Sequence, residues 1–414
     1  MEPFLLNRRD SFYITGVYRK AWESRACCYI LLGVVILCQS CMWSNTNSKP
    51  NQSNITMASI EGSRSAPQEQ MMKLSYPKDG RLYHGVHPAD DKGDESAYID
   101  NPKVLKDYLN AAFPDTAPRR SVAWVYFSHE WEKESYWEFP WDAVRRIDKE
   151  EKSIPFIRLM LRTTYDATKK KEKFFTFERI LRDRKINDAL KRWGERAAEY
   201  GKPLVVEYGT EVNSEIFPWN GVYNGANKGS ADKFKEVYRH IRKVIESAGA
   251  KNITWVFHVT LSDDDTPEWN TIKSYYPGPG LVDWIGISVY GPQTARELCL
   301  SFEDVMQKVM SDRNGVKSLE GGRPLFILEM GVVKDYPQDK PNAVQCEQGV
   351  WAEKALAALA RNPWDLKVRG FSWWNEGWED GGHIEMRVQA NDQLKQVFQN
   401  NILKEKFVHT PVYE

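Results

Sequence analysis

The sequence predicts an α/β fold of the (β/α)8 TIM-barrel type, formed by one large domain over residues 75–414. Three observations indicate this fold. Short apolar or β-branched runs alternate with amphipathic segments, eight such runs occur, and their starts recur every 31 to 49 residues. This spacing is typical of repeated βα units in a parallel sheet, and the length suits one barrel of about 250 to 400 residues. A doubly wound open sheet is the alternative architecture.

The eight expected strands are short apolar or β-branched segments whose interiors carry few polar side chains. In chain order they cover residues 82–87, 122–128, 155–161, 204–208, 253–258, 284–289, 325–328 and 370–374. Runs of this length and composition, separated by helical patterns, favour βα units over a sandwich of paired hairpins.

Amphipathic segments between these strands predict helices. In the clearest one, over 231–250, Phe234, Val237 and Ile241 fall on one face, while Ser230 is placed to cap the start and Gly249 to end the helix. Two further helices are expected over 187–202 and 348–362.

The first 43 residues read as an export signal or a membrane or lipid anchor. Arginines and a lysine precede the apolar run 26–38, which has about the length of a signal-peptide core and is short for a membrane span. Cys41 ends a "CQSC" stretch that is a poor match to a lipoprotein cleavage site, so cleavage, lipidation and a retained anchor all stay open. Residues 44–74 are polar and rich in Ser and Asn, as in a flexible linker. We therefore expect an exported protein, secreted, periplasmic or at the cell surface.

Charge and cysteine content limit the partners. The 57 Lys and Arg residues balance 57 Asp and Glu residues, so no basic field exists for binding nucleic acid. Four of the six cysteines lie in or beside the signal, which leaves Cys299 and Cys346 either to form a disulfide in an oxidising compartment or to stay as small buried side chains. We expect a monomer.

No cofactor or metal is expected, because the chain has no glycine-rich phosphate loop and no cluster of metal ligands. His84 and His87 fall on opposite faces of a strand and so do not share an ion. The "SDDD" stretch at 262–265 is interpreted as a polar loop rather than a calcium site.

The active sites of (β/α)8 barrels gather at the carboxyl ends of the strands, so the residues there are the functional candidates. In chain order these are His87, His129, Glu130, Arg158 or Arg162, Glu211, His258, Tyr290, Glu329 and the segment 373–376. Glu211 and Glu329 follow strands on opposite sides of the barrel. Two carboxylates facing each other across its mouth can cleave a glycosidic bond, one by protonating the leaving oxygen and the other by attacking the anomeric carbon.

An ordered set of motifs resembles family 26 of the glycoside hydrolases, the β-mannanase type. The motifs are "GTEVNSEIFPWNG" at 209–221, "NITWVFHV" at 252–259, "WNTIKSYYPG" at 269–278, "VDWIGISVYG" at 282–291, "RPLFILEMG" at 323–331 and "FSWWNE" at 371–376. The resemblance covers most of the chain from residue 75 onward. It implies a catalytic (β/α)8 domain that cleaves a β-linked polysaccharide internally, with retention of anomeric configuration through a covalent glycosyl-enzyme.

The same resemblance implies roles for individual residues. Glu211 is the expected acid/base and Glu329 the expected nucleophile, Tyr290 hydrogen-bonds the nucleophile, and Trp374 or its neighbour Trp373 forms an aromatic floor under the sugar. The further residues expected to contact sugar are Trp219, Phe217, Asn213, His129 and His258. Glu207 and Glu376 are not expected to be catalytic, and Glu207 is placed to pair with an arginine inside the barrel. A retaining pair of carboxyl groups is expected to lie about 5 to 5.5 Å apart.

Two departures from the family pattern affect the expected substrate. Thr210 replaces a histidine that commonly precedes the acid/base, and Ile216 stands where a tryptophan is common. We expect a plant-type β-1,4-mannan or glucomannan as substrate, with mixed-linkage β-glucan and xylan as alternatives. The alternatives from other classes are a carbohydrate-binding barrel without catalysis and a protein-interaction domain.

Overall fold

The computed structural model describes most of the predicted barrel domain. The described residues are 73–92, 97–131, 134–162, 175–262, 266–293, 298–311, 315–319, 323–334, 346–364, 368–379 and 383–412. The predicted export signal, nearly all of the predicted linker and the aspartates at 263–265 lie outside these ranges. Within them, no helix is both long enough and apolar enough to cross a membrane.

Eight parallel strands close into a barrel, which confirms the predicted fold and excludes the open sheet. They are β1 (Leu82–Pro88), β2 (Trp124–Glu130), β3 (Ile154–Met160), β4 (Leu204–Tyr208), β5 (Ile253–Val259), β6 (Trp284–Tyr290), β7 (Leu325–Gly331) and β8 (Val368–Asn375). Each pairs with its neighbour in chain order, and β8 pairs with β1 to complete the circle. All eight expected strands are present, and β4 matches its expected bounds at both ends.

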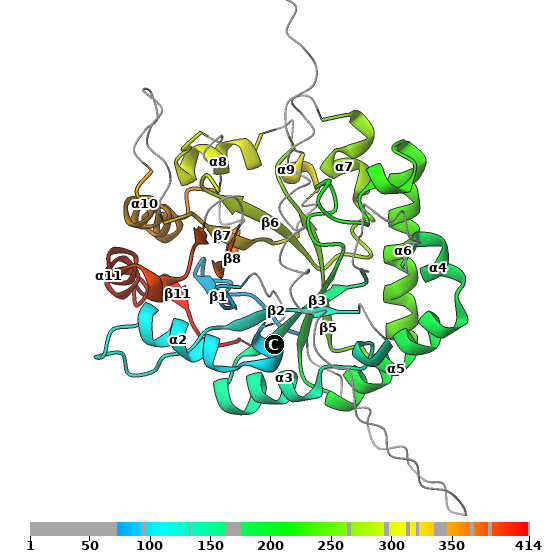
Figure 1. Cartoon of the computed structure of the whole chain (residues 1–414), viewed down its shortest axis with the longest axis horizontal. Coiled ribbons are helices and arrows are strands. Elements are labelled where there is room, and N and C mark those ends of the chain that lie inside the picture. The colour runs from blue at the N-terminus through cyan, green and yellow to red at the C-terminus, as the bar shows by residue number, and fades with distance from the viewer. Residues whose placement is uncertain are drawn as a thin grey trace, which may run out of the picture. The chain divides into compact units, whose positions relative to one another are not determined.

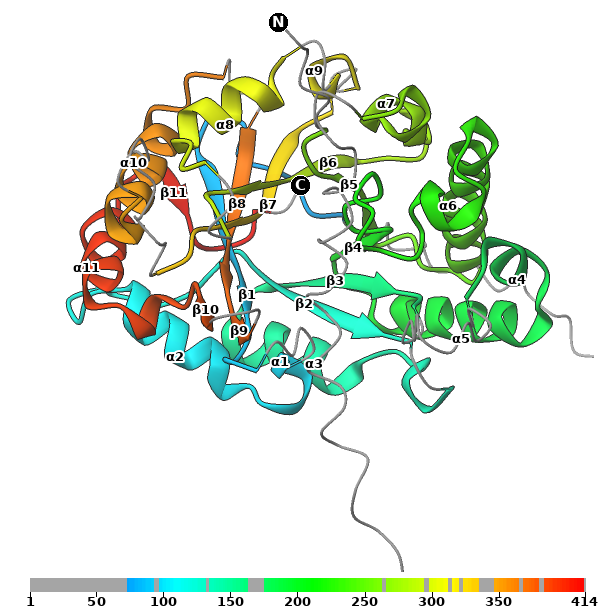
Figure 2. The same cartoon turned by 45° about the horizontal axis from the view of Figure 1, so that its top comes forward.

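Helices surround the strands as an outer ring (Figures 1 and 2). They are α1 (Ala97–Asp100), α2 (Lys103–Ala112), α3 (Trp141–Arg146), α4 (Phe177–Arg182), α5 (Arg184–Tyr200), α6 (Lys228–Ser247), α7 (Ile272–Tyr275), α8 (Phe302–Val309), α9 (Val316–Leu319), α10 (Gln348–Arg361) and α11 (Asp392–Asn401). The three helices expected from periodicity correspond to α5, α6 and α10.

The start of α6 differs from the expectation. The helix begins at Lys228, so Ser230 lies inside its first turn instead of capping it. The Ser230 hydroxyl accepts a hydrogen bond from the backbone N–H of Asn227, which is the residue before the helix. A serine three residues after the cap thus belongs to a capping box, a pattern easily confused with the cap itself when the sequence alone is read. At the other end Gly249 adopts a positive φ of 107°, as expected of a glycine that ends a helix.

The barrel interior changes character from one end to the other. At the amino-terminal end it is filled by Trp124, whose ring packs against Phe156 and Phe326, and by Trp284, which stacks on Phe326 at 3.9 Å. Gly85 makes room for the tryptophan, because a Cβ atom there would lie 2.1 Å from the indole nitrogen of Trp124. Further along the strands the inward side chains become polar and charged, and these carry the site described below.

The C-terminal segment packs beside the amino-terminal end of β1. Strand β11 (Phe407–Val408) pairs in parallel with the start of β1, and His409 follows it. His84 Nδ1 lies 3.1 Å from His409 Nδ1, and His84 Nε2 lies 2.6 Å from the Tyr108 hydroxyl on α2. His87, by contrast, stacks on Trp374 inside the barrel. The two histidines of β1 therefore lie on opposite faces of the strand, as predicted.

A disulfide joins Cys299 to Cys346 and settles which of the two predicted alternatives holds. Cys299 precedes α8 and Cys346 precedes α10, so the bond links the segments that follow β6 and β7. The two cysteines are 47 residues apart in the sequence. The bond lies on the side of the barrel where those strands end.

Candidate active site

A strained turn directly after β4 presents Glu211. Gly209 has φ 79° and Glu211 has φ 42°, both in the left-handed region, which is uncommon for a glutamate. Gly209 also lacks a Cβ atom that would lie 2.6 Å from the Phe234 ring. The turn is fixed by a hydrogen bond from Ser214 N to Glu211 O (2.7 Å) and by another from Val212 N to the carbonyl of His258 on β5 (3.2 Å). Backbone strain of this kind is maintained by its surroundings and is concentrated at functional sites.

Glu329 lies within β7 and is buried, with 5% of its surface exposed. The Tyr290 hydroxyl, from the end of β6, donates to Glu329 Oε2 at 3.0 Å. Arg158 Nη2, from β3, lies 3.4 Å from Glu329 Oε1. The register between β6 and β7 shifts just before Ser288, which is opposite Glu329. One donor and one cation therefore orient this carboxylate from two different strands.

Both glutamates line one pocket of about 510 Å³. Arg158, Tyr290 and Trp374 line it as well. Its volume falls in the range of small-molecule sites, and a lining of aromatic groups and a few converging polar groups is usual for them.

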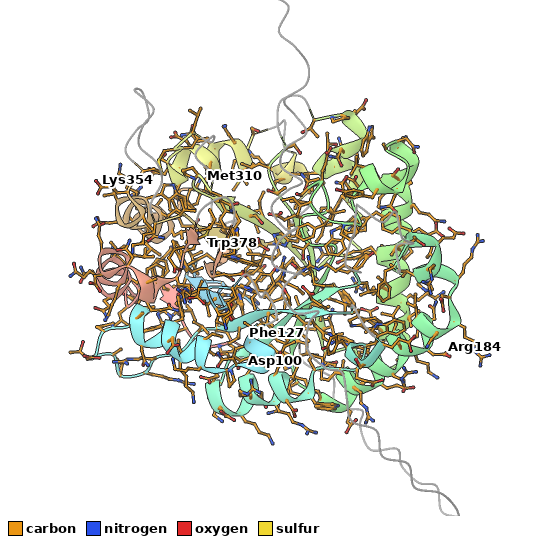
Figure 3. All side chains as sticks on the ribbon, viewed as in Figure 1. Asp100, Phe127, Arg184, Met310, Lys354 and Trp378 are labelled. Carbon is orange, nitrogen blue, oxygen red and sulfur yellow. A yellow bond between two sulfur atoms is a disulfide. The ribbon has the colours of Figure 1, made fainter. Side chains whose placement is uncertain are left out.

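Apolar side chains also line this pocket. They include Ile216 and Leu298, whose side chains are exposed, together with Phe217 and Trp378. Figure 3 shows Trp378 over the middle of the barrel, while Arg184 and Lys354 lie out in the ring of helices. A lining of both apolar and charged side chains suits a ligand with both hydroxyl groups and C–H faces.

Burial raises the pKa of Glu329 to about 7, the Arg158 guanidinium opposes this rise, and the Glu211 carboxylate adds to it. Burial and the Glu329 carboxylate also raise the pKa of Tyr290, so its hydroxyl remains a donor. With a pKa raised to about 7, the Glu329 carboxyl group can carry a proton near neutral pH.

Beneath the pocket, Glu207 of β4 is fully buried among polar partners. The Tyr126 hydroxyl donates to Glu207 Oε1 at 2.7 Å, and the Thr210 hydroxyl donates to the same oxygen. His258 Nδ1 lies 3.0 Å from Glu207 Oε2, and Arg158 Nε lies 3.5 Å from Glu207 Oε1. The predicted pairing of Glu207 with an arginine is confirmed.

These contacts decide the protonation of the pair formed by Glu207 and His258. Burial raises the pKa of Glu207, but the cations His258 and Arg158 and the hydrogen bonds outweigh it, so the net direction is down. Burial lowers the pKa of His258, but the Glu207 carboxylate outweighs it, so the net direction is up. Both shifts favour a buried ion pair over two neutral groups.

The two neighbouring tryptophans of β8 have different surroundings. Trp374 lines the pocket and stacks on His87 with 3.7 Å between ring centroids. Trp373 is fully buried, donates from its indole nitrogen to Met386 O (2.8 Å) and packs edge-on against Phe398. Of the two, Trp374 is placed to be the aromatic floor, while Trp373 packs between the barrel and its surrounding helices.

Several other predicted sugar-contacting residues do not line the pocket. Trp219 is buried, with its indole nitrogen donating to Thr210 O at 2.7 Å, and stacks on Phe217, which does reach the pocket. Asn213 holds two loops together through Thr260, donating to its carbonyl and accepting from its N–H. His129 is buried, and burial lowers its pKa to about 4. Together with His258, these side chains shape the site from behind.

Arg158 and Ser288 are among the pocket residues that the sequence left undecided or did not single out. Arg158 and Arg162 were alternatives, and the structure places Arg158 in the pocket, whereas Arg162 pairs with Glu130. Ser288 was not singled out, although it lies two residues before Tyr290 on the same strand. Because side chains alternate along a strand, a residue two positions from a site tyrosine shares its face, and this signal could have found Ser288.

The fold and the site together define a (β/α)8 barrel protein with a carboxylate-containing cleft at the carboxyl ends of its strands. Within this class, residues 171–319 match the family model of glycosyl hydrolase family 26. The resemblance predicted from the ordered motifs is thereby confirmed.

Curated relatives match part of the chain. A β-1,3-xylanase (TXYA) of Vibrio sp. is 23% identical over 233 residues, and a β-1,3-xylanase of Alcaligenes sp. is 26% identical over 233 residues. Each match covers 51% of this chain and 45% of the relative. Endoglucanase H of Acetivibrio thermocellus is 26% identical over 149 residues, which cover 36% of this chain and 16% of that protein. The chain thus spans less than half the length of the curated relatives it matches.

Solved structures of mannanases are similar in arrangement. A β-mannanase from a symbiotic protist of the termite Reticulitermes speratus aligns with a TM-score of 0.47 at 15% identity, covering 80% of this chain and 89% of that one. A Bacillus subtilis mannanase aligns with a TM-score of 0.46 at 15% identity, covering 81% and 91%.

Proposed function

We propose that this protein is a glycoside hydrolase of family 26, a retaining endo-β-glycanase in which Glu329 is the nucleophile and Glu211 the acid/base. The observation that carries the proposal is that both carboxylates line one cleft, with Glu329 contacted by Tyr290 and Arg158. The match of residues 171–319 to the family supports it as well.

The proposed reaction has two displacements. In the first, Glu329 attacks the anomeric carbon while Glu211 gives its proton to the oxygen of the departing sugar, so the glycosidic bond breaks as an ester bond to Glu329 forms. In the second, Glu211 takes a proton from water, and the water oxygen replaces Glu329 at the anomeric carbon. The enzyme returns to its starting state, and the product keeps the original anomeric configuration.

The surrounding residues support this division of roles. A hydrogen bond from Tyr290 and the charge of Arg158 both favour the ionised form of Glu329, which is the form that a nucleophile needs. We assign Trp374 the aromatic floor, because it lines the cleft and its ring is held flat by stacking on His87. Phe217 lines the same cleft and provides a second apolar surface.

For the substrate, β-1,4-mannan or glucomannan is the first candidate, on the strength of the mannanase-type motifs. β-1,3-Xylan is the second, because the two curated relatives described above are β-1,3-xylanases. Thr210 and Ile216 bear on this choice in different ways. Thr210 is buried and donates to Glu207, whereas Ile216 lines the pocket and is 44% exposed. Ile216 is therefore the departure placed to touch a sugar directly.

The test is reducing-sugar release by the purified chain from mannan, glucomannan, mixed-linkage β-glucan, β-1,4-xylan and β-1,3-xylan, with Glu329→Ala run beside it. Release of sugar from the mannans, lost in the variant, supports the mannanase assignment. Release from β-1,3-xylan alone makes the protein a β-1,3-xylanase with the same proposed mechanism. Nuclear magnetic resonance of the first product then reports its anomeric configuration. Inverted product, or no release from any glycan, contradicts the proposal.

We also propose that the protein works outside the cytoplasm. The disulfide between Cys299 and Cys346 is a bond that persists in oxidising compartments, and it supports the export predicted from the first 43 residues. Fractionation of cells that express the full chain tests this proposal, and recovery in the cytoplasmic fraction contradicts it. Treatment of the membrane fraction with salt or detergent separates a soluble exported form from an anchored one.

A further inference from the structure

Four buried groups of alternating charge cross the barrel beneath the cleft. In order they are His258 on β5, Glu207 on β4, Arg158 on β3 and Glu329 on β7. The closest distances between neighbours are 3.0 Å, 3.5 Å and 3.4 Å. All four side chains are nearly inaccessible to solvent, so their interactions are only weakly screened. A change of charge at one end therefore affects the other.

Arg158 is the link between Glu207 and the proposed nucleophile. It is the direct register partner of Glu207 on the adjacent strand. Its Nη1 donates to Ser128 Oγ (3.0 Å) and its Nε to Thr210 Oγ1 (3.3 Å), while its guanidinium carbon lies 5.0 Å from the centre of the Trp374 ring. The guanidinium is thus held from several sides with Nη2 directed at Glu329.

We propose that Glu207 is a positioning residue: through its ion pair with Arg158 it fixes the guanidinium against the Glu329 carboxylate, which favours the ionised form of that carboxylate against burial and aims it into the cleft. The nucleophile role of Glu329 in this statement rests on the proposed function. The geometry of the four charges does not depend on it.

Other charged or titratable groups also surround Glu329. Glu211 faces it from the turn after β4, Tyr290 from β6 and Tyr126 from β2. From β1 and the end of β8, His87 and Glu376 face each other with 3.5 Å between Nε2 and Oε2. In the part of the chain that the structure describes, the cation at ion-pair distance from Glu329 is Arg158. The ionised form of Glu329 therefore depends chiefly on where Arg158 lies.

The competing explanation is that Glu207 is a neighbouring anion with no positioning role, and the two explanations predict opposite signs. Replacing a neighbouring anion by a neutral group favours ionisation of Glu329 and lowers its pKa. If Glu207 instead holds Arg158 in place, its replacement weakens the contact between the Arg158 guanidinium and the Glu329 carboxylate and raises the pKa of Glu329. In Glu207→Gln the proton on His258 is lost as well, so the net charge of the interior hardly changes and the position of Arg158 decides the result.

The experiment follows the titration of Glu329 by infrared difference spectroscopy, using Glu329→Gln to assign its carboxyl band. Arg158→Met is expected to move the midpoint up by about one pH unit or more, since a cation at this distance lowers a carboxyl pKa by about 1–3 units. Glu207→Gln is expected to move it in the same direction. Adding Glu207→Gln to Arg158→Met is expected to change nothing further, because Glu207 then has no guanidinium to position. Arg158→Lys, which keeps a positive charge, is expected to raise the midpoint less than Arg158→Met does.

Activity supplies an independent readout on the full chain. The acid limb of kcat/KM is expected to follow the infrared midpoint, and kcat in Glu207→Gln is expected to fall on the order of 100-fold with KM little changed, as for a displaced catalytic group. Arg242→Met is the matched control. Arg242 forms a similarly short, largely buried ion pair with Glu246 at 2.8 Å on α6, away from the pocket lining, so its loss is expected to leave the midpoint and the acid limb unchanged.

A lower or unchanged Glu329 midpoint in Glu207→Gln overturns the proposal, as do additive effects in the double variant. If Arg158→Met does not fold, the Glu329 midpoint is compared in two other variants. These are the double variant, which removes both buried charges together, and Arg158→Lys. Absence of activity in the unaltered chain on every glycan contradicts the proposed function alone, because the infrared arm tests the positioning of Arg158 without turnover.

Discussion

Two histidines, one near each end of the barrel, are equally buried and yet differ in protonation. His258 lies 3.0 Å from the Glu207 carboxylate, which raises its pKa against the effect of burial. His84 lies 3.1 Å from His409 and 2.6 Å from the Tyr108 hydroxyl, and there burial, together with the second imidazole, lowers its pKa. Burial alone thus decides neither case. The partner determines whether a buried imidazole is a cation or a neutral hydrogen-bonding group.

This difference suggests that the two ends of the barrel have different roles, one in catalysis and the other in stability. Beneath the cleft, a set of paired charges surrounds the candidate nucleophile. At the opposite end, hydrogen bonds join His84 of β1 to His409 of the C-terminal segment and to Tyr108 of α2. Changes at the first end should therefore alter turnover more than stability, and changes at the second should do the reverse. The following predictions test that separation.

The largest effect is expected at Glu329. In Glu329→Ala we expect turnover to fall by roughly 10⁴-fold or more, the scale seen when a nucleophile is removed. The midpoint of thermal unfolding should stay close to that of the unaltered protein or rise, since the raised pKa of Glu329 means that its ionised form costs folding free energy, a cost that alanine removes. Glycan hydrolysis and calorimetry on the same preparation measure both. Turnover that survives in the variant would remove Glu329 from the proposed role.

Glu211→Ala should show a smaller loss that depends on the substrate. With polysaccharide, whose leaving sugar needs a proton, kcat should fall by about 10² to 10⁴-fold, the contribution typical of general acid–base catalysis. With an aryl glycoside whose leaving group needs no proton, the first displacement should be nearly unaffected, so a burst of released phenol should precede slow turnover. Stopped-flow absorbance detects this burst. Equal losses on both substrates would argue against the acid/base role.

The fold was accessible from the sequence because it depends on local patterns. Each strand is an apolar run and each major helix an amphipathic segment, so the eight strands were located from periodicity and spacing alone. The missed detail at the start of α6 was also local: Asn227 and Ser230 both suit a helix start, and only the backbone shows which residue comes before the helix. Element order and type were thus more accessible than element ends.

The site was only partly accessible, for a physical reason. Position along a strand identified Glu329 and Tyr290 as neighbours at one end of the barrel, but not which of two adjacent aromatic side chains points into the cleft. Trp373 and Trp374 are adjacent and chemically alike, and only packing separates the ring in the cleft from the one behind it. Arg158 and Glu207 became recognisable as partners only once the register of β3 against β4 was known.

Removal of the disulfide should have an intermediate effect on stability and a small one on activity. The bond closes a separation of 47 residues, for which loop-closure entropy gives a loss of about 4 kcal/mol at most. Leu298 and Leu300 flank Cys299 and line the pocket, so KM should rise modestly while kcat is kept. Urea unfolding and steady-state kinetics of Cys299→Ala/Cys346→Ala measure the two effects. An unchanged unfolding midpoint would show that the linked segments are held by other contacts.

The smallest effect is expected at the amino-terminal end of the barrel, and it depends on pH. Burial lowers the pKa of His409 from an ordinary value of 6.5 to about 4, so the imidazole is neutral in the folded protein. Its contribution is fully present above pH 6.5 and is lost as the pH falls through about 4, and the shift corresponds to about 3 kcal/mol at most. His258, with its raised pKa, has the opposite sign: its contribution is present at low pH and is lost as the pH rises through the folded value.

Replacing His409 by asparagine should therefore flatten the loss of unfolding free energy between pH 6.5 and pH 4, with little change in kcat at neutral pH. Urea denaturation at several pH values across this window measures the slope, and glycan hydrolysis at pH 7 provides the activity control. His84→Asn is the companion variant, because it removes the other half of the imidazole pair. An unchanged slope in both variants would mean that protonation of this pair does not limit acid stability, and a large loss of kcat would mean that the two ends of the barrel are coupled.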